Sequence, residues 1–117
     1  NYISGILQKL KLFAESHDIH IWFVAHPAKQ YRNKSDGQIP VPTLNDISGS
    51  NSWWTKADYG LVLHRKRDEQ GQRSTTVEVH VQKIRFQPWM GSEGMCHLAL
   101  DQRTGRYRPD LYADNGI

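Results

Sequence analysis

An alternating segment, Val77-Glu78-Val79-His80-Val81-Gln82-Lys83-Ile84-Arg85-Phe86, sets the fold that we expect. Valine alternates with a polar residue up to Gln82, which is typical of a strand with one wet face in an antiparallel or edge pairing. Lys83 and Arg85 stand two residues apart, so they share one face of an extended chain. A strand end that directs two cations to one point predicts a site for a polyanion. We interpret it as a site for a triphosphate at a subunit boundary.

The composition fits one domain with a modest core, because the chain has 117 residues of which 38% are hydrophobic. A net charge of +3 and a pI near 9.1 are compatible with nucleic-acid binding but do not establish it. The single cysteine, Cys96, excludes an internal disulfide framework and indicates a reducing compartment. No apolar run approaches the roughly 20 residues that cross a bilayer, so we expect no membrane contact. There is no signal-peptide pattern, and the first residues look like helix interior, as if cut from a longer protein.

The first half of the chain predicts a helix and two buried strands. Residues 19–25 are apolar on both faces, as in a central parallel strand that is covered on both sides. Residues 44–58 are expected to be helical in part, interrupted at Gly49, and residues 59–64 predict a second buried strand. The helix is expected to end near residue 17, because its apolar residues follow the helical period: Ile3, Ile6, Leu7, Leu10, Phe13 and Ala14.

Polar segments separate these elements. Residues 27–42 predict a long exposed loop, and loops of that length in compact domains are usually functional or disordered. Residues 65–74 predict a charged turn centred on Gly71. Residues 95–108 predict a hairpin with Gly105 in the left-handed conformation, and we expect the tail 109–117 to fray.

Three segments occur together in a recognisable order: Val24-Ala25-His26-Pro27-Ala28-Lys29, then Asp46-Ile47-Ser48-Gly49-Ser50-Asn51 running into Lys56-Ala57-Asp58, then Gln82-Lys83-Ile84-Arg85-Phe86 followed by Gly91. In this order the chain resembles the hexameric replicative helicases of the DnaB class, and most of all their Twinkle and phage primase–helicase branch. The resemblance extends to about Tyr107. It implies that residues 1–117 are the C-terminal half of a RecA-like ATPase core. The implied fold class is α/β, with parallel central strands and an antiparallel edge hairpin.

The chain departs from that family's pattern in three places. Gln87-Pro88-Trp89-Met90 stands where a compact glycine turn is usual, and Trp53 and Trp54 replace smaller or polar residues. No G-x-x-x-x-G-K-[ST] loop occurs. The Walker A loop and the acidic Walker B strand are therefore expected upstream of residue 1. Only the longer protein, an ATP-dependent DNA helicase, is expected to bind ATP or another NTP with Mg²⁺, and residues 1–117 alone are not expected to hydrolyse it.

The resemblance also implies roles for single residues. His26 would sense the γ-phosphate, while Lys83 and Arg85 would reach a nucleotide held by the next subunit, where an arginine stabilises the charge of phosphoryl transfer. Because these two cations would come from a neighbouring copy of the same protein, the resemblance implies a homo-oligomer, which in this family is a hexameric ring. Two loops would contact single-stranded DNA in the channel, because mobile cations suffice for sequence-neutral phosphate binding. Their residues are Lys29, Arg32 and Lys34 in one loop, and Ser48, Gly49, Ser50 and Asn51 in the other.

Simpler interpretations stay open for each of these residues: a strand-ending histidine, a solvated Lys-x-Arg pair, a basic surface loop and a helix cap. A different class of function also stays open, namely a non-catalytic nucleic-acid or protein-binding module derived from a RecA-like domain. A recombinase or clock-type ATPase would share the fold. The histidines and Cys96 lack the spacing of a metal site, so none is expected. The expected location is the cytoplasm of a bacterium or phage-infected host, or the mitochondrial matrix.

Overall fold

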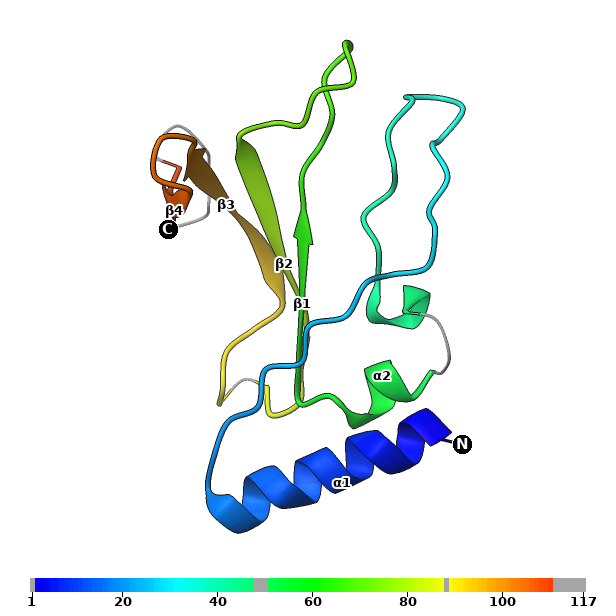
Figure 1. Ribbon diagram of the computed structural model, residues 1–117, viewed down its shortest axis with the longest axis vertical. Coiled ribbons are helices and arrows are strands. Elements are labelled where there is room, and N and C mark those ends of the chain that lie inside the picture. The colour runs from blue at the N-terminus through cyan, green and yellow to red at the C-terminus, as the bar shows by residue number, and fades with distance from the viewer. Residues whose placement is uncertain (1, 48–50, 88, 111–117) are drawn as a thin grey trace.

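The computed structural model describes residues 2–47, 51–87 and 89–110 of the chain. A four-stranded antiparallel sheet, with its strands in sequence order, lies beside two helices, and two long loops extend from the same side of the molecule (Figure 1). The elements are α1 (Tyr2–His17), the 3-10 helix η1 (Leu44–Asp46), α2 (Ser52–Lys56), β1 (Tyr59–His64), β2 (Thr76–Ile84), β3 (Gly94–Asp101) and β4 (Arg106–Pro109).

The predicted N-terminal helix is confirmed as α1. It ends where Asp18 adopts a positive φ of 51° and the Ile19 amide bonds to the carbonyl of Ala14 at 3.0 Å. A hydrogen bond of 3.0 Å from Lys56 Nζ to Gln8 Oε1 links α2 to α1. None of the residues of α1 is fully buried, so its apolar stripe is only partly covered by the rest of the described chain.

The expected strand at 19–25 is wrong, because this segment has no strand structure. All three pairings among the described strands are antiparallel, so the parallel central strands and the RecA-like core are not confirmed. The physical reason is that a central strand needs a ladder partner, and the described residues supply none for 19–25. Two of its side chains stay in water: Trp22 is 74% exposed and Val24 is 85% exposed.

The predicted strand at 59–64 is confirmed as β1, but it is not buried as expected: Leu63 is 67% exposed. Its Gly60 is the exception, because it lies directly under Leu44 of η1 and a Cβ at this position would overlap the Leu44 side chain. The absence of a side chain at Gly60 therefore lets η1 rest on the sheet.

The alternating segment is confirmed as β2, which pairs with β1 on one edge and β3 on the other. The expected wet face is wrong, because Val77 and Glu78, which point to opposite faces, are both buried. Glu78 can lie there because His80 Nε2 is 2.9 Å and Lys66 Nζ is 3.6 Å from its carboxylate oxygens. The alternating pattern therefore identified the strand correctly. It did not indicate that the ion pairs of Glu78 would allow a charged side chain to be buried.

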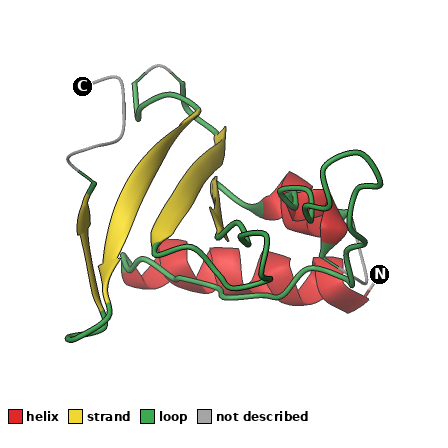
Figure 2. Cartoon of the chain, turned by 90° about the horizontal axis from the view of Figure 1, so that it is seen from above, coloured by secondary structure: helices red, strands yellow, loops and turns green. Residues whose placement is uncertain are grey.

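The two loops and the final hairpin follow the expectations. Residues 27–43 leave the core and return through a turn in which the Gly37 amide bonds to the Asn33 carbonyl at 2.9 Å. Gly71 and Gly105 both have positive φ, as their turns require. The hairpin is β3 and β4, while residues 111–117 of the expected tail lie outside the described part. Seen from above, α1 runs across the ends of the strands and continues beyond one edge of the curved sheet (Figure 2).

Candidate functional site

Lys83 bends from the end of β2 toward the C-terminal end of α2. Its Nζ donates hydrogen bonds to the carbonyls of Trp54 and Thr55, the second at 3.4 Å, and lies 5.5 Å from the centre of the Trp54 ring. The last carbonyls of a helix have no partner within the helix and carry partial negative charge, so they attract a cation. Lys83 therefore caps α2.

Arg85 reaches the same place from the turn that follows β2. Its Nη2 donates to the carbonyls of Thr55 at 2.8 Å and Ala57 at 3.2 Å, and its Nε donates to Asp58 Oδ1 at 2.8 Å. Its own amide bonds to the Asp58 carbonyl at 2.9 Å. The side chains of the Arg85–Asp58 pair are 32% and 40% exposed, so the pair is held in place without being buried.

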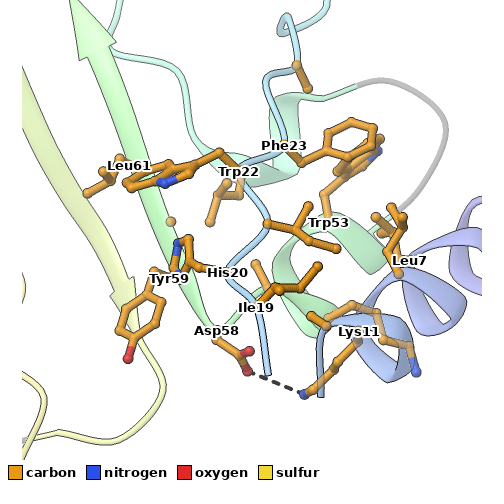
Figure 3. A pocket seen from close by; sticks show the side chains of 18 of the residues that line it. Leu7, Lys11, Ile19, His20, Trp22, Phe23, Trp53, Asp58, Tyr59 and Leu61 are labelled. Atoms are coloured by element: carbon orange, nitrogen blue, oxygen red, sulfur yellow. Dashed lines mark ion pairs between the residues drawn. The ribbon is translucent and has the colours of Figure 1, made fainter. Parts of the chain in front are cut away.

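Asp58 also pairs with Lys11 of α1 at 3.3 Å, an ion pair drawn as a dashed line in Figure 3. One carboxylate thus connects α1 with the Arg85 side chain. Burial lowers the pKa of Lys83, and the nearby charge of Arg85 acts in the same direction, while Asp58 opposes the shift. An anion placed beside Lys83 and Arg85 would favour the charged form of Lys83 and would offset the repulsion between the two cations.

The expected meeting of Lys83 and Arg85 is therefore present, but its reason differs from the one predicted. Arg85 lies one residue beyond the end of β2, so a shared strand face does not bring the two together. The end of α2 does so, because both cations bond to its carbonyls. Their role toward a neighbouring nucleotide stays a prediction.

His26 is exposed and lies at the base of the 27–43 loop, beside an isolated bridge between Pro27 and Ile47. The expected position at a strand end is wrong, because residues 19–25 are not a strand. His26 makes no hydrogen bond, ion pair or ring contact with another described residue, including Lys83 and Arg85. The structure does not bring these three predicted residues into one site.

Lys29, Arg32 and Lys34 are exposed on the 27–43 loop, and Lys29 Nζ lies 5.7 Å from the centre of the Tyr31 ring. Lys29 and Arg32 also line a cavity of about 440 Å³ between this loop and the 65–74 turn, whereas Lys34 does not. Three cations that the sequence analysis did not single out line the same cavity: Arg65, Arg67 and Arg73. The charge run of the turn could have indicated them, but its contact with the loop could not be read from the sequence.

The second predicted DNA element is only partly described, because Ser48, Gly49 and Ser50 lie outside the described residues. Asn51 is at the N-cap position of α2, where its carbonyl accepts hydrogen bonds from the amides of Trp54 at 3.2 Å and Thr55 at 3.3 Å. Its side chain makes no capping hydrogen bond. The position agrees with the helix-cap alternative.

A larger, mostly apolar cavity of about 540 Å³ lies between α1, residues 18–25, α2 and β1 (Figure 3). Leu7 and Trp53 enter it from the helices, and Leu61 enters it from β1. The Trp53 ring packs on Phe23 with ring centres 4.8 Å apart, so Trp53 serves packing here. The charged residues that line this cavity are of both signs, with Lys11 and Lys56 beside Glu15, Asp18 and Asp58, so its described lining has no excess of positive charge for a phosphate.

Two properties of the described residues bear on the class of site. No group of three histidine, cysteine, aspartate or glutamate side chains is placed to hold a metal ion in residues 2–47, 51–87 and 89–110. No helix of these ranges is long and apolar enough to span a membrane.

Comparison with known proteins supports the resemblance that the three ordered motifs indicated. No family model matches the chain. The sequence is 41% identical over 106 residues to the Twinkle homolog protein, chloroplastic/mitochondrial, of Arabidopsis thaliana. The match covers 91% of this chain but only 14% of that protein. The similarity supports a relation to the DnaB-like helicase family, in which this chain corresponds to a short part of one relative.

Proposed function

We propose that the chain is part of the motor domain of a replicative DNA helicase that moves along single-stranded DNA. The observation that carries this proposal is the 41% identity over 106 residues to a Twinkle homolog. The name of that relative gives chloroplasts and mitochondria as its location, which favours the organellar alternative for this chain. Nothing in the comparison supports the expected bacterial cytoplasm.

Lys83 and Arg85 are the residues best suited to hold a nucleotide bound by a neighbouring subunit. A guanidinium and an ammonium group offer the donors that a triphosphate requires, and arginine stays charged at any physiological pH. The Arg85 bonds use Nε and Nη2, which leaves Nη1 without a partner in the described part of the chain. ATP, or another NTP, with Mg²⁺ would be bound upstream in the longer protein, and Arg85 would stabilise the charge that develops on the transferred phosphate.

The exposed apolar surface supports a larger assembly than the described residues. Trp22, Phe23 and Val24 are all more than half exposed and follow one another in the chain. Monomeric proteins seldom leave a continuous apolar segment of this kind in water. Further parts of a RecA-like core, or a neighbouring subunit of a hexameric ring, would cover it.

The remaining predicted residues fit the same proposal. His26 would sense the γ-phosphate from the base of the 27–43 loop, so that loss of the phosphate moves the loop. Lys29, Arg32 and Lys34 would hold the DNA backbone together with the Ser48, Gly49, Ser50 and Asn51 element. Lys29, Arg32 and Lys34 are exposed, so these three side chains are accessible to phosphates.

The test is strand separation by the longer protein that contains this chain, on a forked DNA duplex with ATP and Mg²⁺. We expect Arg85→Ala to reduce ATP turnover at least about 10³-fold, which is the lower range for loss of a trans-acting arginine. Binding of a single-stranded oligonucleotide should change little, and Arg103→Ala on the β3–β4 turn is the matched control. Normal turnover by Arg85→Ala would refute the trans-acting role.

The basic cavity between the two loops favours a second candidate, a non-catalytic module that binds nucleic acid. The same experiment separates the two. A longer protein that binds single strands but neither hydrolyses NTP nor separates a duplex would favour the module. NTP-driven strand exchange without unwinding would instead favour a recombinase.

A further inference from the structure

We propose that the cavity between the 27–43 loop and the 65–74 turn is a groove that binds the phosphates of one polynucleotide strand. Among the residues that line this cavity, the proposed function assigns only Lys29 and Arg32 to DNA. The site would be completed by Arg65, Arg67 and Arg73. We call this cavity the two-loop groove. The inference rests on the proposed function in taking single-stranded DNA as the strand.

The two sides of the groove are joined by the side chain of Gln38. Its Nε2 donates to the Arg67 carbonyl at 2.9 Å, and its Oε1 accepts from the Arg67 amide at 3.4 Å. Figure 1 shows the loop and the turn extending in the same direction from the core. A residue of the loop thus pairs with the backbone of the turn as another strand would, which fixes the distance between the two sets of cations.

The turn itself is an ordered scaffold. The amide of Asp68 bonds to the Gln72 carbonyl at 2.8 Å, and the Gly71 amide bonds to the Asp68 carbonyl at 3.0 Å. Arg67 Nη1 donates to the Gly71 carbonyl at 2.7 Å, and Arg65 Nε donates to the Ser74 carbonyl at 2.8 Å. Both arginines are therefore oriented by neutral carbonyl groups, which leave their positive charge uncompensated.

The charge of the groove is strongly one-sided. Its lining includes five lysine and arginine side chains and no carboxylate. The aspartates of the loop and the turn accept hydrogen bonds from backbone amides close by in the chain: Asp36 Oδ1 from the Gln38 amide at 2.9 Å, and Asp68 Oδ1 from the Gln72 amide at 2.8 Å. Since the whole chain has a net charge of only +3, its excess positive charge is concentrated here. Such a concentration raises the affinity for a polyanion.

The residues that line the two-loop groove favour a polynucleotide strand over a free nucleotide with bound Mg²⁺. Mg²⁺ bound to a nucleotide prefers one or two carboxylate ligands, and no carboxylate lines the groove. Strand phosphates need only cations, and the bases can stack on aromatic side chains. Tyr107 of β4 and His64 of β1 line the groove and offer such surfaces.

The test uses Arg73→Gln in the longer protein, because Arg73 is exposed and its side chain makes no hydrogen bond or ion pair with another described residue. Arg103→Gln on the β3–β4 turn is the matched control, since it removes the same charge from an exposed turn outside the groove. Binding of a fluorescent oligothymidylate is measured by anisotropy over a series of salt concentrations, and ATP binding is measured separately. Thermal unfolding of both variants verifies that they are folded.

We expect Arg73→Gln to weaken oligothymidylate binding several-fold and to reduce the slope of log K against log salt by about 0.7, the value for one lost phosphate contact on a single strand. Arg103→Gln should change neither quantity. Arg32→Gln combined with Arg73→Gln should reduce the slope by about twice as much.

Equal slopes for Arg73→Gln and Arg103→Gln would overturn the proposal. Weaker ATP binding with unchanged DNA binding would also overturn it, because the groove would then hold a nucleotide. If Arg73→Gln changes the slope but the unsubstituted protein separates no duplex, the groove stands and the helicase function fails. If the duplex is separated normally by Arg73→Gln with an unchanged slope, only the groove fails.

Discussion

At the scale of single residues, one carboxylate holds the Arg85 side chain and connects it with α1. Asp58 accepts a hydrogen bond from Arg85 Nε at 2.8 Å and pairs with Lys11 at 3.3 Å. Charge-assisted hydrogen bonds of this kind are about twice as strong as neutral ones. Asp58 therefore orients the Arg85 guanidinium while the carbonyls of α2 support it from the other side.

We expect Asp58→Asn in the longer protein to lower kcat for ATP hydrolysis by about tenfold, equivalent to about 1.4 kcal/mol of lost positioning. The KM for ATP should change little, because Asp58 does not contact the proposed nucleotide. Steady-state kinetics measures both constants. The result follows from a guanidinium that is less well oriented, although it keeps its charge.

Lys11→Gln is the control for Asp58→Asn. It removes the other ion pair of Asp58 but keeps the contact with Arg85, so kcat should stay near the unsubstituted value. A loss of kcat as large in Lys11→Gln as in Asp58→Asn would indicate that the α1 contact, and not the orientation of Arg85, is what matters.

At the scale of elements, close approach between backbone and side chain fixes how η1 rests on the sheet. Leu44 is one of the few buried apolar residues of the described chain, and it lies over Gly60 of β1. The sequence identified residues 59–64 as a strand from their apolar character. The sequence did not indicate that Gly60 contacts Leu44, which lies sixteen positions earlier in the chain.

Gly60→Ala should lower the stability of β1 by about 1–3 kcal/mol, because the added methyl group overlaps Leu44. Hydrogen exchange of the β1 and β2 amides in the longer protein measures the change. Gly94→Ala on β3 is the matched control, because a methyl group there would meet no atom within 4 Å. Leu44→Ala added to Gly60→Ala should recover part of the loss; no recovery would mean that the overlap with Leu44 is not its cause.

At the scale of the whole molecule, the described core is small and its polar interior is unusual. Only Leu44 and Val77 are buried apolar residues among those described, and Glu78 is buried beside them. Burial alone would raise the pKa of Glu78, but the hydrogen bond from His80 and the charge of Lys66 outweigh it, so the pKa is lowered. Burial lowers the pKa of His64, and Glu78 only partly offsets this effect. Both shifts link the stability of the sheet to pH.

We expect the sheet to lose stability as the pH falls. A lowered pKa means that the folded state binds fewer protons than the unfolded state, so each contribution is full above the unfolded value and is lost below it. The loss begins near 6.5 for His64 and near 4.5 for Glu78. This loss of stability is measured by hydrogen exchange of the β1 and β2 amides across the pH range, corrected for intrinsic exchange rates.

His64→Gln should remove the decline in sheet stability that begins as the pH falls below 6.5, while leaving the decline below pH 4.5 that Glu78 causes. His17→Gln, at the exposed end of α1, is the control and should leave the whole profile unchanged. A profile in His64→Gln identical to that of the unsubstituted protein would contradict the assignment to His64.

The sequence by itself determined the elements that depend on local pattern: α1 from its helical period, β2 from its alternation, and the β3–β4 hairpin from Gly105. It also indicated the relation to the helicase family from the order of three motifs, and the 41% identity to a Twinkle homolog supports this relation. It could not determine contacts between distant segments. The apolar composition of residues 19–25 indicated burial but not which segment would pack against them, and so the expected parallel strand was wrong.

Only the tertiary structure decided where the cations meet. Lys83 and Arg85 meet because both donate hydrogen bonds to carbonyls of α2, although Arg85 lies beyond the strand that was expected to align them. Gln38 joins the 27–43 loop to the 65–74 turn, so that cations more than thirty positions apart line one groove. The physical reason is that charge and periodicity are properties of neighbouring residues, whereas a binding site depends on which backbone groups, far apart in the chain, bond to one another.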